Sequence, residues 1–456
     1  MTGPIAPSDT ALTPLLARET ERFEREHPAS VAHAARARES LLGGVPMSWM
    51  LRWASPVPLV LREARGATVT DIDGHTYADL CLGDTGAMTG HGPAPIVEAI
   101  TDRYARGATA MLPTEDAAWV GTELTRRFGV DRWQFTVSAT DANRFALRMA
   151  RAITGRPKVL VFSYCYHGTV DEAFITLEDG RPAVREGNVG PAFDVRETTR
   201  VVEFNDLDAL ERELRHEDVA VVLTEPALTN IGIVLPEPGF HDELRRLCTE
   251  TGTLLLIDET HTLSAGPGGC TQAWGLDPDI VVVGKAIAGG VPTGAFGMRA
   301  ELAARMLADR DADIEDVGGV GGTLAGNALS MAAARAALGE VLTDDAYAHT
   351  ITLAGRFADG VRDVLARHGV PWHVTQLGAR AEYRFSAEPP RDGGASAAIG
   401  HEGLERFLHL HALNRGVLIT PFHNMALMSP ATAEADVDRH TAAFDDAVGE
   451  IAATLG

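Results

Sequence analysis

The sequence predicts an α/β fold, with a mostly parallel sheet, helices on both faces of that sheet, and a smaller α+β domain. Short continuous apolar runs alternate with helical periods through the middle of the chain, as expected where crossover helices cover both faces of a parallel sheet. The last part of the chain mixes helices and strands without this regular alternation. With 456 residues, the chain is also too long for one small core.

We expect strands where apolar residues run together, and helices where they recur every three or four positions. The predicted strands of the large domain are 132–138, 158–163, 219–225, 253–259 and 279–285. The predicted helices are 141–155, 240–252 and a long Ala-rich helix at 327–342. Gly155 and Gly252 stand where the first two helices should end. Strand and helix alternate as in units with right-handed crossovers.

The flanking regions predict a second, smaller domain. Near the N-terminus we expect a helix and a hairpin-like segment at 58–80, with turns at Arg65-Gly66 and Asp73-Gly74. In the tail we expect helices at 354–369 and 403–416, strands at 380–386 and 417–420, and a loop at 386–403. The expected divisions are an N-terminal segment (1–75) contributing to the small domain and the pocket, a large domain (76–335) and a small α+β domain (336–456).

Composition narrows the class of partner to small molecules. A net charge of -23 opposes binding to nucleic acid and to anionic membranes. No apolar run reaches the ~18 residues that a membrane span needs, and the first residues show no basic and apolar pattern of a secretory signal. The four cysteines are far apart and lack zinc-type spacing, so we expect reduced thiols, no metal site and a cytoplasmic protein.

One lysine stands out by its position. The chain has only two lysines, Lys158 and Lys285, and uses arginine at its other Lys/Arg positions. Lys285 follows the apolar run 280–283 and precedes small residues that would let a planar ligand approach. A desolvated lysine can lose its proton and attack a carbonyl, which arginine cannot do. We therefore interpret Lys285 as a Schiff-base lysine and Lys158 as a surface residue.

Side chains at neighbouring strand ends suit pyridoxal phosphate as the carbonyl partner of Lys285. The pyridine nitrogen of that cofactor needs a carboxylate, and Asp258 follows an apolar strand. The phosphate needs amides and hydroxyls at a helix N-terminus, which Ser138 and Thr140 could provide. Tyr166 could stack on the ring. Each residue also has a structural alternative: Asp258 as a helix cap, Ser138 and Thr140 as an ordinary N-cap, and Tyr166 as a core residue.

With these residues in view, the chain resembles the fold-type I pyridoxal phosphate enzymes and, among them, the class III (omega) aminotransferases. The matching motifs run in order from about residue 58 to 340 and include "SATDAN", "YHG", "TEP", "LLLIDET", "GKAIAGGVPTGAFGM" and "GGTLAGN". Within this class, the motifs of the chain resemble those of glutamate semialdehyde aminomutase and the β-amino-acid aminotransferases. The resemblance implies pyridoxal 5′-phosphate as cofactor and a homodimer with shared active sites.

The resemblance also implies residue roles. Lys285 would be the Schiff-base lysine and proton shuttle, and Asp258 the partner of the ring nitrogen. The remaining cofactor contacts would be Ser138, Ala139 and Thr140 at the phosphate, Tyr166 and His167 in the ring-stacking segment, Thr260 on the other ring face, Glu225 near the ring hydroxyl, and Thr323 reaching the phosphate of the neighbouring subunit.

Three segments depart from the family pattern. Ala139 and Asp141 replace the Gly and Glu of the usual phosphate loop Ser-Gly-Thr-Glu-Ala. The usual Asp-Glu-Val becomes "DETHT", which puts the hydroxyl-bearing Thr260 at the ring and adds His261. The segment "YCYHG" brings Tyr164 and a cysteine close to the expected site. None of these changes removes a group that the chemistry requires.

The reaction we expect is transamination, from an amino acid or amine with an apolar or aromatic group to a 2-oxo acid. An aminomutase or a racemase would use the same lysine, aspartate and phosphate cup, so both stay open. A regulatory cofactor-binding protein would be expected to lack the lysine or the aspartate. For the substrate pocket we single out Trp49, Arg52 and Met88. Further candidates are Met50, Trp53 and Asp84 for the wall and Arg384, Arg415 and His423 for a carboxylate.

Overall fold

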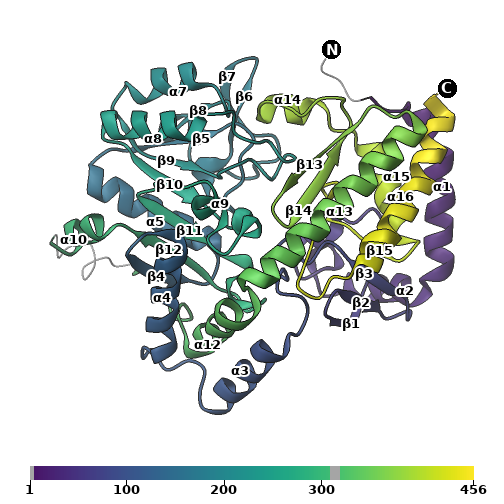
Figure 1. Cartoon of the computed structure of the whole chain (residues 1–456), viewed down its shortest axis with the longest axis horizontal. Helices are drawn as coiled ribbons and strands as arrows, with labels where there is room; N and C mark the ends of the chain where they lie inside the picture. The colour runs from purple at the N-terminus through teal and green to yellow at the C-terminus, as the bar shows by residue number, and fades with distance from the viewer. Residues whose placement is uncertain (1–4, 309–318, 456) are drawn as a thin grey trace. The chain divides into compact units, whose positions relative to one another are not determined.

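The computed structural model describes residues 5–308 and 319–455 and divides the chain into two compact units (Figure 1). The large unit comprises Ala94–Tyr347 and Pro390–Ala397, and the small unit comprises Met1–Pro93, Ala348–Pro389 and Ala398–Gly456. These limits differ from the expected 75/76 and 335/336. Residues 76–79 belong to the small unit because they form a strand that pairs with residues 417–418.

The large unit is built on a seven-stranded sheet with the order β4-β12-β11-β10-β9-β5-β8. The strands are β4 (Arg132–Thr136), β5 (Lys158–Phe162), β8 (Thr199–Val202), β9 (Val219–Thr224), β10 (Leu254–Asp258), β11 (Ile280–Val283) and β12 (Gly294–Met298). Only β12 runs antiparallel to its neighbours in this sheet. A separate hairpin joins β6 (Ile175–Glu178) and β7 (Arg181–Val184). The expected mostly parallel α/β sheet is confirmed.

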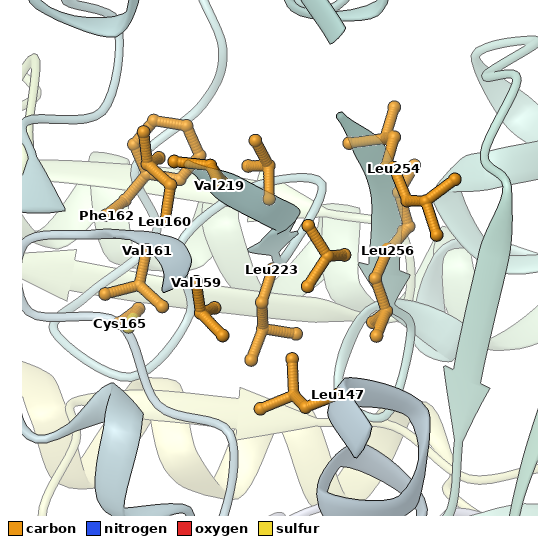
Figure 2. Packing of buried hydrophobic residues seen from close by; sticks show 14 of the residues in the cluster. Leu147, Val159, Leu160, Val161, Phe162, Cys165, Val219, Leu223, Leu254 and Leu256 are labelled. Carbon is orange, nitrogen blue, oxygen red and sulfur yellow. The ribbon is translucent and has the colours of Figure 1, made fainter. Parts of the chain in front are cut away.

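Helices α5, α7, α8 and α10 supply side chains to the core of this sheet, and further helices complete the large unit. Together these helices are α3 (Ala94–Ala105), α4 (Glu115–Phe128), α5 (Ala139–Thr154), α6 (Val195–Thr198), α7 (Leu207–Leu214), α8 (Phe240–Thr251), α9 (Gly269–Ala273), α10 (Ala300–Ala308), α12 (Ala328–Ala336) and α14 (Gly393–Ala398). All six residues of β9 are buried, and side chains of a strand alternate between its two faces, so both faces are covered. Figure 2 shows Leu147 of α5 on the same side as Val159 and Val161, with Leu160 on the other side.

The small unit contains two mostly antiparallel sheets and several long helices. The first sheet has β1 (Leu61–Arg65), β2 (Thr68–Asp71), β3 (Thr76–Asp79) and β15 (Val417–Leu418), and the second has β13 (His373–Leu377), β14 (Arg380–Arg384) and β16 (Met425–Leu427). The helices are α1 (Asp9–Glu26), α2 (Pro28–Ala37), α13 (Asp344–His368), α15 (Glu402–Leu413) and α16 (Glu434–Leu455). The first residues of α13 belong to the large unit, so this helix carries the chain across the division.

Some expected elements change on folding. The loop expected at 386–403 contains the short helix α14, because the Asp392 carboxylate accepts the amide of Ala395 at 2.8 Å and starts a helical turn. The helix expected at 327–342 is regular only to Ala336 and continues as a π-turn, Ala337–Val341. Helix α5 begins at Ala139, two residues before the expected start, because the Ser138 side chain caps it.

The cysteines and the helices bear on the expectations of reduced thiols and of no membrane span. All four cysteines are buried with free thiols. None of the helices in the described part of the chain combines the length and the apolar character needed to span a bilayer.

Buried Arg127 ties α4 to two other segments of the large unit. Its guanidinium donates to the backbone carbonyl of Pro267 at 3.0 Å and to those of Leu338 and Leu342 at 2.6 and 3.0 Å. Its Nε also donates to the Glu123 carboxylate at 2.8 Å. The side chain is only 2% exposed. One planar fork of donors therefore satisfies carbonyl groups that are remote in sequence.

Replacing Arg127 with methionine should destabilise the large unit by about 2–4 kcal/mol, because buried carbonyl groups would lose their donors. Thermal unfolding followed by circular dichroism would show this as a lower transition temperature. Arg126→Ala is the matched control: the neighbouring guanidinium also bonds to Glu123, but its side chain is 58% exposed. Equal shifts in the two variants would contradict this role of Arg127.

Candidate active site

Three ionisable side chains follow the carboxyl ends of neighbouring parallel strands in the large unit. Glu225 comes directly after β9, Asp258 ends β10, and Lys285 comes two residues after β11. Strand β10 pairs in parallel with both β9 and β11, so the three strand ends lie at one edge. Ligands of doubly wound sheets bind outside this edge, which makes it the candidate site.

Lys285 lies in a tight and strained turn. Its φ is +50°, in the left-handed region that residues other than glycine seldom adopt. The preceding Gly284 lies so close to α5 that an added Cβ would come within 2.8 Å of the Ala139 Cβ. An added Cβ on Gly289, which follows, would come within 2.3 Å of Ile96 Cδ1. Strain of this kind concentrates at functional sites, and here close packing on both sides maintains it.

The Lys285 amine belongs to a chain of hydrogen bonds that leads into the protein. Its Nζ lies 2.5 Å from Nε2 of His261, and Nδ1 of His261 lies 2.9 Å from the Thr229 hydroxyl. That hydroxyl donates to the Glu225 carboxylate. Glu225, Thr229 and His261 are 3%, 1% and 7% exposed, whereas Lys285 is half-buried. These hydrogen bonds thus connect the half-buried Lys285 amine to the buried Glu225 carboxylate.

Asp258 is the centre of a second buried network. One oxygen of its carboxylate, Oδ2, accepts from Asn143 Nδ2 at 2.8 Å and from His167 Nδ1 at 2.9 Å. The other oxygen accepts the backbone amide of Thr260 at 3.0 Å. Asn143 also donates to the carbonyl of His167 at 3.2 Å, which links the two donors to each other. Asp258 is therefore held rigidly from three sides.

The protonation states of this network follow from burial and pairing. Burial alone would raise the pKa of the Asp258 carboxyl, but the hydrogen bond and charge of His167, with the bonds from Thr260 and Asn143, lower this pKa overall. Burial alone would lower the pKa of His167, but the Cys165 sulfur and the Asp258 carboxylate raise it to about 10. At neutral pH the pair is therefore a carboxylate with an imidazolium.

The N-terminus of α5 has the form of an anion-binding site, although its hydroxyls already have partners. The Ser138 hydroxyl accepts the amide of Asp141 at 3.2 Å and donates to the Asp141 carboxylate at 3.0 Å. The Thr140 hydroxyl accepts the amide of Thr169 at 3.2 Å. The structure thus supports the N-cap alternative for Ser138. The first backbone amides of this 16-residue helix, including that of Ala139, are the groups suited to a phosphate.

The ring-stacking segment also has structural contacts. The guanidinium of Arg185 lies 5.6 Å from the ring centroid of Tyr164 and donates to the Cys165 carbonyl at 2.7 Å. These contacts give Tyr164 and Cys165 a packing role. Tyr166 is half-buried, and its neighbour His167 is buried in the Asp258 network. Stacking of Tyr166 on a cofactor ring therefore stays a prediction.

The other predicted site residues lie elsewhere. Thr323 is exposed and lines a cavity of about 470 Å³, together with residues 109–113, 319, 320, 322 and 325–328. Trp49, Arg52 and Met88 belong to the small unit. There Trp49 packs on Phe422 with ring centroids 4.9 Å apart, Arg52 lies 5.5 Å from the Trp49 ring, and Met88 is 2% exposed. Their substrate contacts stay predictions.

Two residues of these networks were missed at the level of sequence. Asn143 could have been suspected, because it follows the Ser138 cap by five residues on the first turns of a helix that begins at the strand edge. No sequence signal points to Thr229, which lies in the loop after β9. His261 stood out only as a departure from the family pattern.

The residues of this edge fit pyridoxal phosphate. Asp258 accepts three hydrogen bonds, and a carboxylate has about four acceptor sites, so capacity remains for a protonated ring nitrogen. The Thr260 hydroxyl is buried and has no hydrogen-bond partner among the described residues. The Lys285 amine and the N-terminus of α5 supply a covalent anchor and phosphate donors, and Gly284 brings them together.

The ion pair of His167 and Asp258 should make stability depend on pH. A histidine with a raised pKa stabilises the fold fully below its unfolded pKa of about 6.5, and this contribution is lost as pH rises through about 10. We expect His167→Gln to lower the unfolding temperature most near pH 6 and progressively less towards pH 10. Differential scanning fluorimetry of both proteins across this range would check it. A difference independent of pH would contradict the pairing.

Solved structures with the same fold cover nearly the whole chain. A glutamate-1-semialdehyde-aminomutase from Pseudomonas aeruginosa PAO1 has 49% sequence identity over 98% of this chain and 100% of its own, with a TM-score of 0.95. A variant of that enzyme with a lysine replaced by alanine was solved in complex with PMP. An omega-transaminase from Sphaerobacter thermophilus has 30% identity over 94% of this chain and 99% of its own, with a TM-score of 0.86.

Sequence comparison gives a consistent result. Glutamate-1-semialdehyde 2,1-aminomutase from Chloroflexus aggregans is 32% identical over 450 residues, which cover 95% of this chain and 99% of the relative. The family model for class-III aminotransferases matches residues 49–448. Pyridoxal 5′-phosphate, the predicted cofactor, is thereby confirmed at the level of the family. The chain belongs to the class-III aminotransferase family.

Proposed function

We propose that this chain uses pyridoxal 5′-phosphate, held by Lys285, to move an amino group between two carbons of one small substrate, as an aminomutase does. The observation that carries the chemistry is the position of Lys285. Its amine lies at the edge of a parallel sheet, hydrogen-bonded to buried His261 at 2.5 Å, and Asp258 ends the neighbouring strand. A lysine in this setting can act as a covalent anchor and as a proton carrier.

Each residue of the edge has a role in the proposal. When bound, the cofactor supplies an electron sink beside the amine-bearing carbon of the substrate. Asp258 would keep the ring nitrogen protonated, and its own charge is secured by His167 and Asn143. The α5 amides would hold the phosphate. Lys285, once released from its covalent role, would take a proton from one substrate carbon and return it at the next position.

The relatives support an intramolecular reaction better than the transamination that the motifs led us to expect. The Chloroflexus aggregans relative and the 49% identical Pseudomonas aeruginosa neighbour both carry the name of a glutamate-1-semialdehyde aminomutase. Transamination is the second candidate, because an omega-transaminase and a β-phenylalanine aminotransferase from Variovorax paradoxus, 28% identical with a TM-score of 0.84, share the fold. The 2-oxo acid acceptor belongs to that second candidate alone.

The proposal includes a homodimer in which Thr323 contacts the cofactor phosphate of the neighbouring chain. Exposure of apolar side chains beside it supports this part of the proposal. Met111 and Leu112 are 82% and 71% exposed, and Leu324 is 58% exposed. Apolar patches of this kind commonly mark contacts between chains.

Hydride reduction of the purified, cofactor-loaded protein should attach the cofactor to Lys285, because only this lysine lies at the carboxyl edge of the sheet. Peptide mass spectrometry would locate the label. Lys285→Ala should remove both label and turnover. The matched control is Lys158→Arg, which changes the chain's other lysine, paired at 3.5 Å with Asp218 at the amino ends of β5 and β9; it should retain both. Label on Lys158 would refute the proposal.

Dependence on an added 2-oxo acid separates the two reactions. We expect isomerisation of glutamate 1-semialdehyde to proceed without pyruvate or 2-oxoglutarate, because the amino group returns to the same carbon skeleton. Product formation would be followed by chromatography of derivatised amines, with a panel of amino donors tested in parallel. Turnover only when a 2-oxo acid is present would favour transamination, and loss of chirality without amino transfer would favour a racemase.

A further inference from the structure

We propose that His261, Thr229 and Glu225 form a proton relay that serves Lys285. The inference rests on the proposed function, in which Lys285 takes up and gives back a proton. It adds a destination for that proton, a buried carboxylate reached through two side chains. His261 and Thr229 are positioning residues in this scheme, since they act on the reaction through Lys285.

The hydrogen positions give the relay a direction. The Thr229 hydroxyl donates its one hydrogen to the Glu225 carboxylate, so it must accept from His261, whose Nδ1 lies 2.9 Å away. A neutral imidazole carries hydrogen on one nitrogen only. With that hydrogen on Nδ1, Nε2 is an acceptor and receives a hydrogen from the Lys285 amine at 2.5 Å. Every link therefore has one donor and one acceptor.

A single shift of protons along the relay balances without any other reactant. A Lys285 N–H bond breaks as a bond forms at His261 Nε2, and the hydrogen on Nδ1 passes to the Thr229 oxygen. Thr229 gives its original hydrogen to Glu225. The ammonium and the carboxylate become a neutral amine and a carboxylic acid. Moving charge this way avoids leaving an isolated ion in a buried site, which is costly.

The loop after β9 is built to keep Thr229 in place. Leu228 and Val234 exchange backbone hydrogen bonds of 3.1 and 2.9 Å, which closes the loop. Nε2 of His241 lies 2.7 Å from the carbonyl of Pro226 at the start of the loop. On the other side, the Ser264 hydroxyl donates to the His261 carbonyl at 3.0 Å. Relay members thus sit on fixed backbone, as proton transfer over short distances requires.

The carboxylates next to His261 in sequence are engaged with other donors. Asp258 accepts from His167, Asn143 and the amide of Thr260. Glu259 accepts from the Thr262 hydroxyl and from the backbone amides of residues 270 and 271. Glu225 is the carboxylate bonded to the Thr229 hydroxyl. The relay is therefore a different network from that of Asp258, which would hold the ring nitrogen.

The identity of residue 261 supports a role in proton transfer. Histidine can accept at one ring nitrogen while it donates at the other, and its pKa lies near neutral pH. Valine or another apolar residue could fill space in the turn but could not connect Lys285 to Thr229. The "DETHT" departure from the family pattern thus supplies the middle of the relay.

The two-lysine composition makes the relay directly measurable. Full-length protein labelled with ¹³C at lysine Cε gives one signal for Lys285 and one for Lys158 as internal reference. We expect Glu225→Gln to lower the pKa of Lys285 by about one unit, a tenfold change in its protonation ratio, because the anionic end of the relay is lost. In a Thr229→Val background the same substitution should shift it less than half as much.

Matched variants distinguish the relay from general disturbance of the site. Thr229→Ser keeps the hydroxyl and should preserve the Lys285 titration, whereas Thr229→Val alone should lower the pKa of Lys285. Thr262→Val removes an equivalent hydroxyl that donates to buried Glu259 at 2.5 Å and should leave Lys285 unchanged. These single variants test the relay even if Glu225→Gln fails to fold.

The outcomes separate this inference from the proposed function. Equal shifts of the Lys285 titration by Glu225→Gln with and without the Thr229 hydroxyl would overturn the relay, since charge would then act through space alone. The relay would also be overturned if Glu225→Gln left the Lys285 titration unchanged. In cofactor-loaded protein, the pH at which the cofactor absorbance changes should shift among the variants in the same order as the Lys285 titration. Failure of hydride labelling at Lys285 would refute the proposed function, whatever the lysine titrations show.

Discussion

The parallel pairing of β9, β10 and β11 is the constraint on which the site depends. Because these strands run in the same direction, their carboxyl ends meet at one edge, and residues distant in sequence become neighbours. Glu225, Asp258 and Lys285 each sit at or just beyond one of these ends. The strands are buried on both faces, so their ends cannot slide without disrupting the core.

Three buried polar side chains with separate partners share this edge, and the "DETHT" segment keeps them apart. Asp258 faces donors from α5 and from the loop after β5, and Glu259 faces the amides at the start of α9. Gly269 allows that second contact, since an added Cβ would come within 2.1 Å of the Glu259 carboxylate. His261 is turned to Thr229 and Lys285. Each buried charge or dipole thus has its own partners, which reduces the cost of desolvation.

The predictable part of this protein is the part that local pattern determines. Strands β5, β9, β10 and β11 are continuous apolar runs, and all four were expected close to their observed positions. Strand β12 was missed because "GAFGM" is rich in glycine; its glycines are needed where Gly297 packs on the Trp133 ring and Gly294 on Ser138. Such close approaches depend on the assembled sheet, so the pattern of one strand does not reveal them.

The same distinction applies to the site. Lys285 and Asp258 could be predicted, because a strand end followed by a reactive side chain is a local signal. Their network partners Asn143, His167 and Thr229 come close only through contacts across the fold. Thr229 reaches His261 because the loop after β9 is closed by the Leu228–Val234 bridge. Residues that tune a reactive group are therefore harder to read from sequence than the group itself.

Lysine at position 285 follows from what the surrounding groups require. His261 offers Nε2 as an acceptor and sits in a network that can take up a proton. A guanidinium would fill the acceptor but could not release its proton, since its pKa lies above about 12. An amine on a flexible stem meets both conditions, which explains why a chain that otherwise uses arginine carries lysine here.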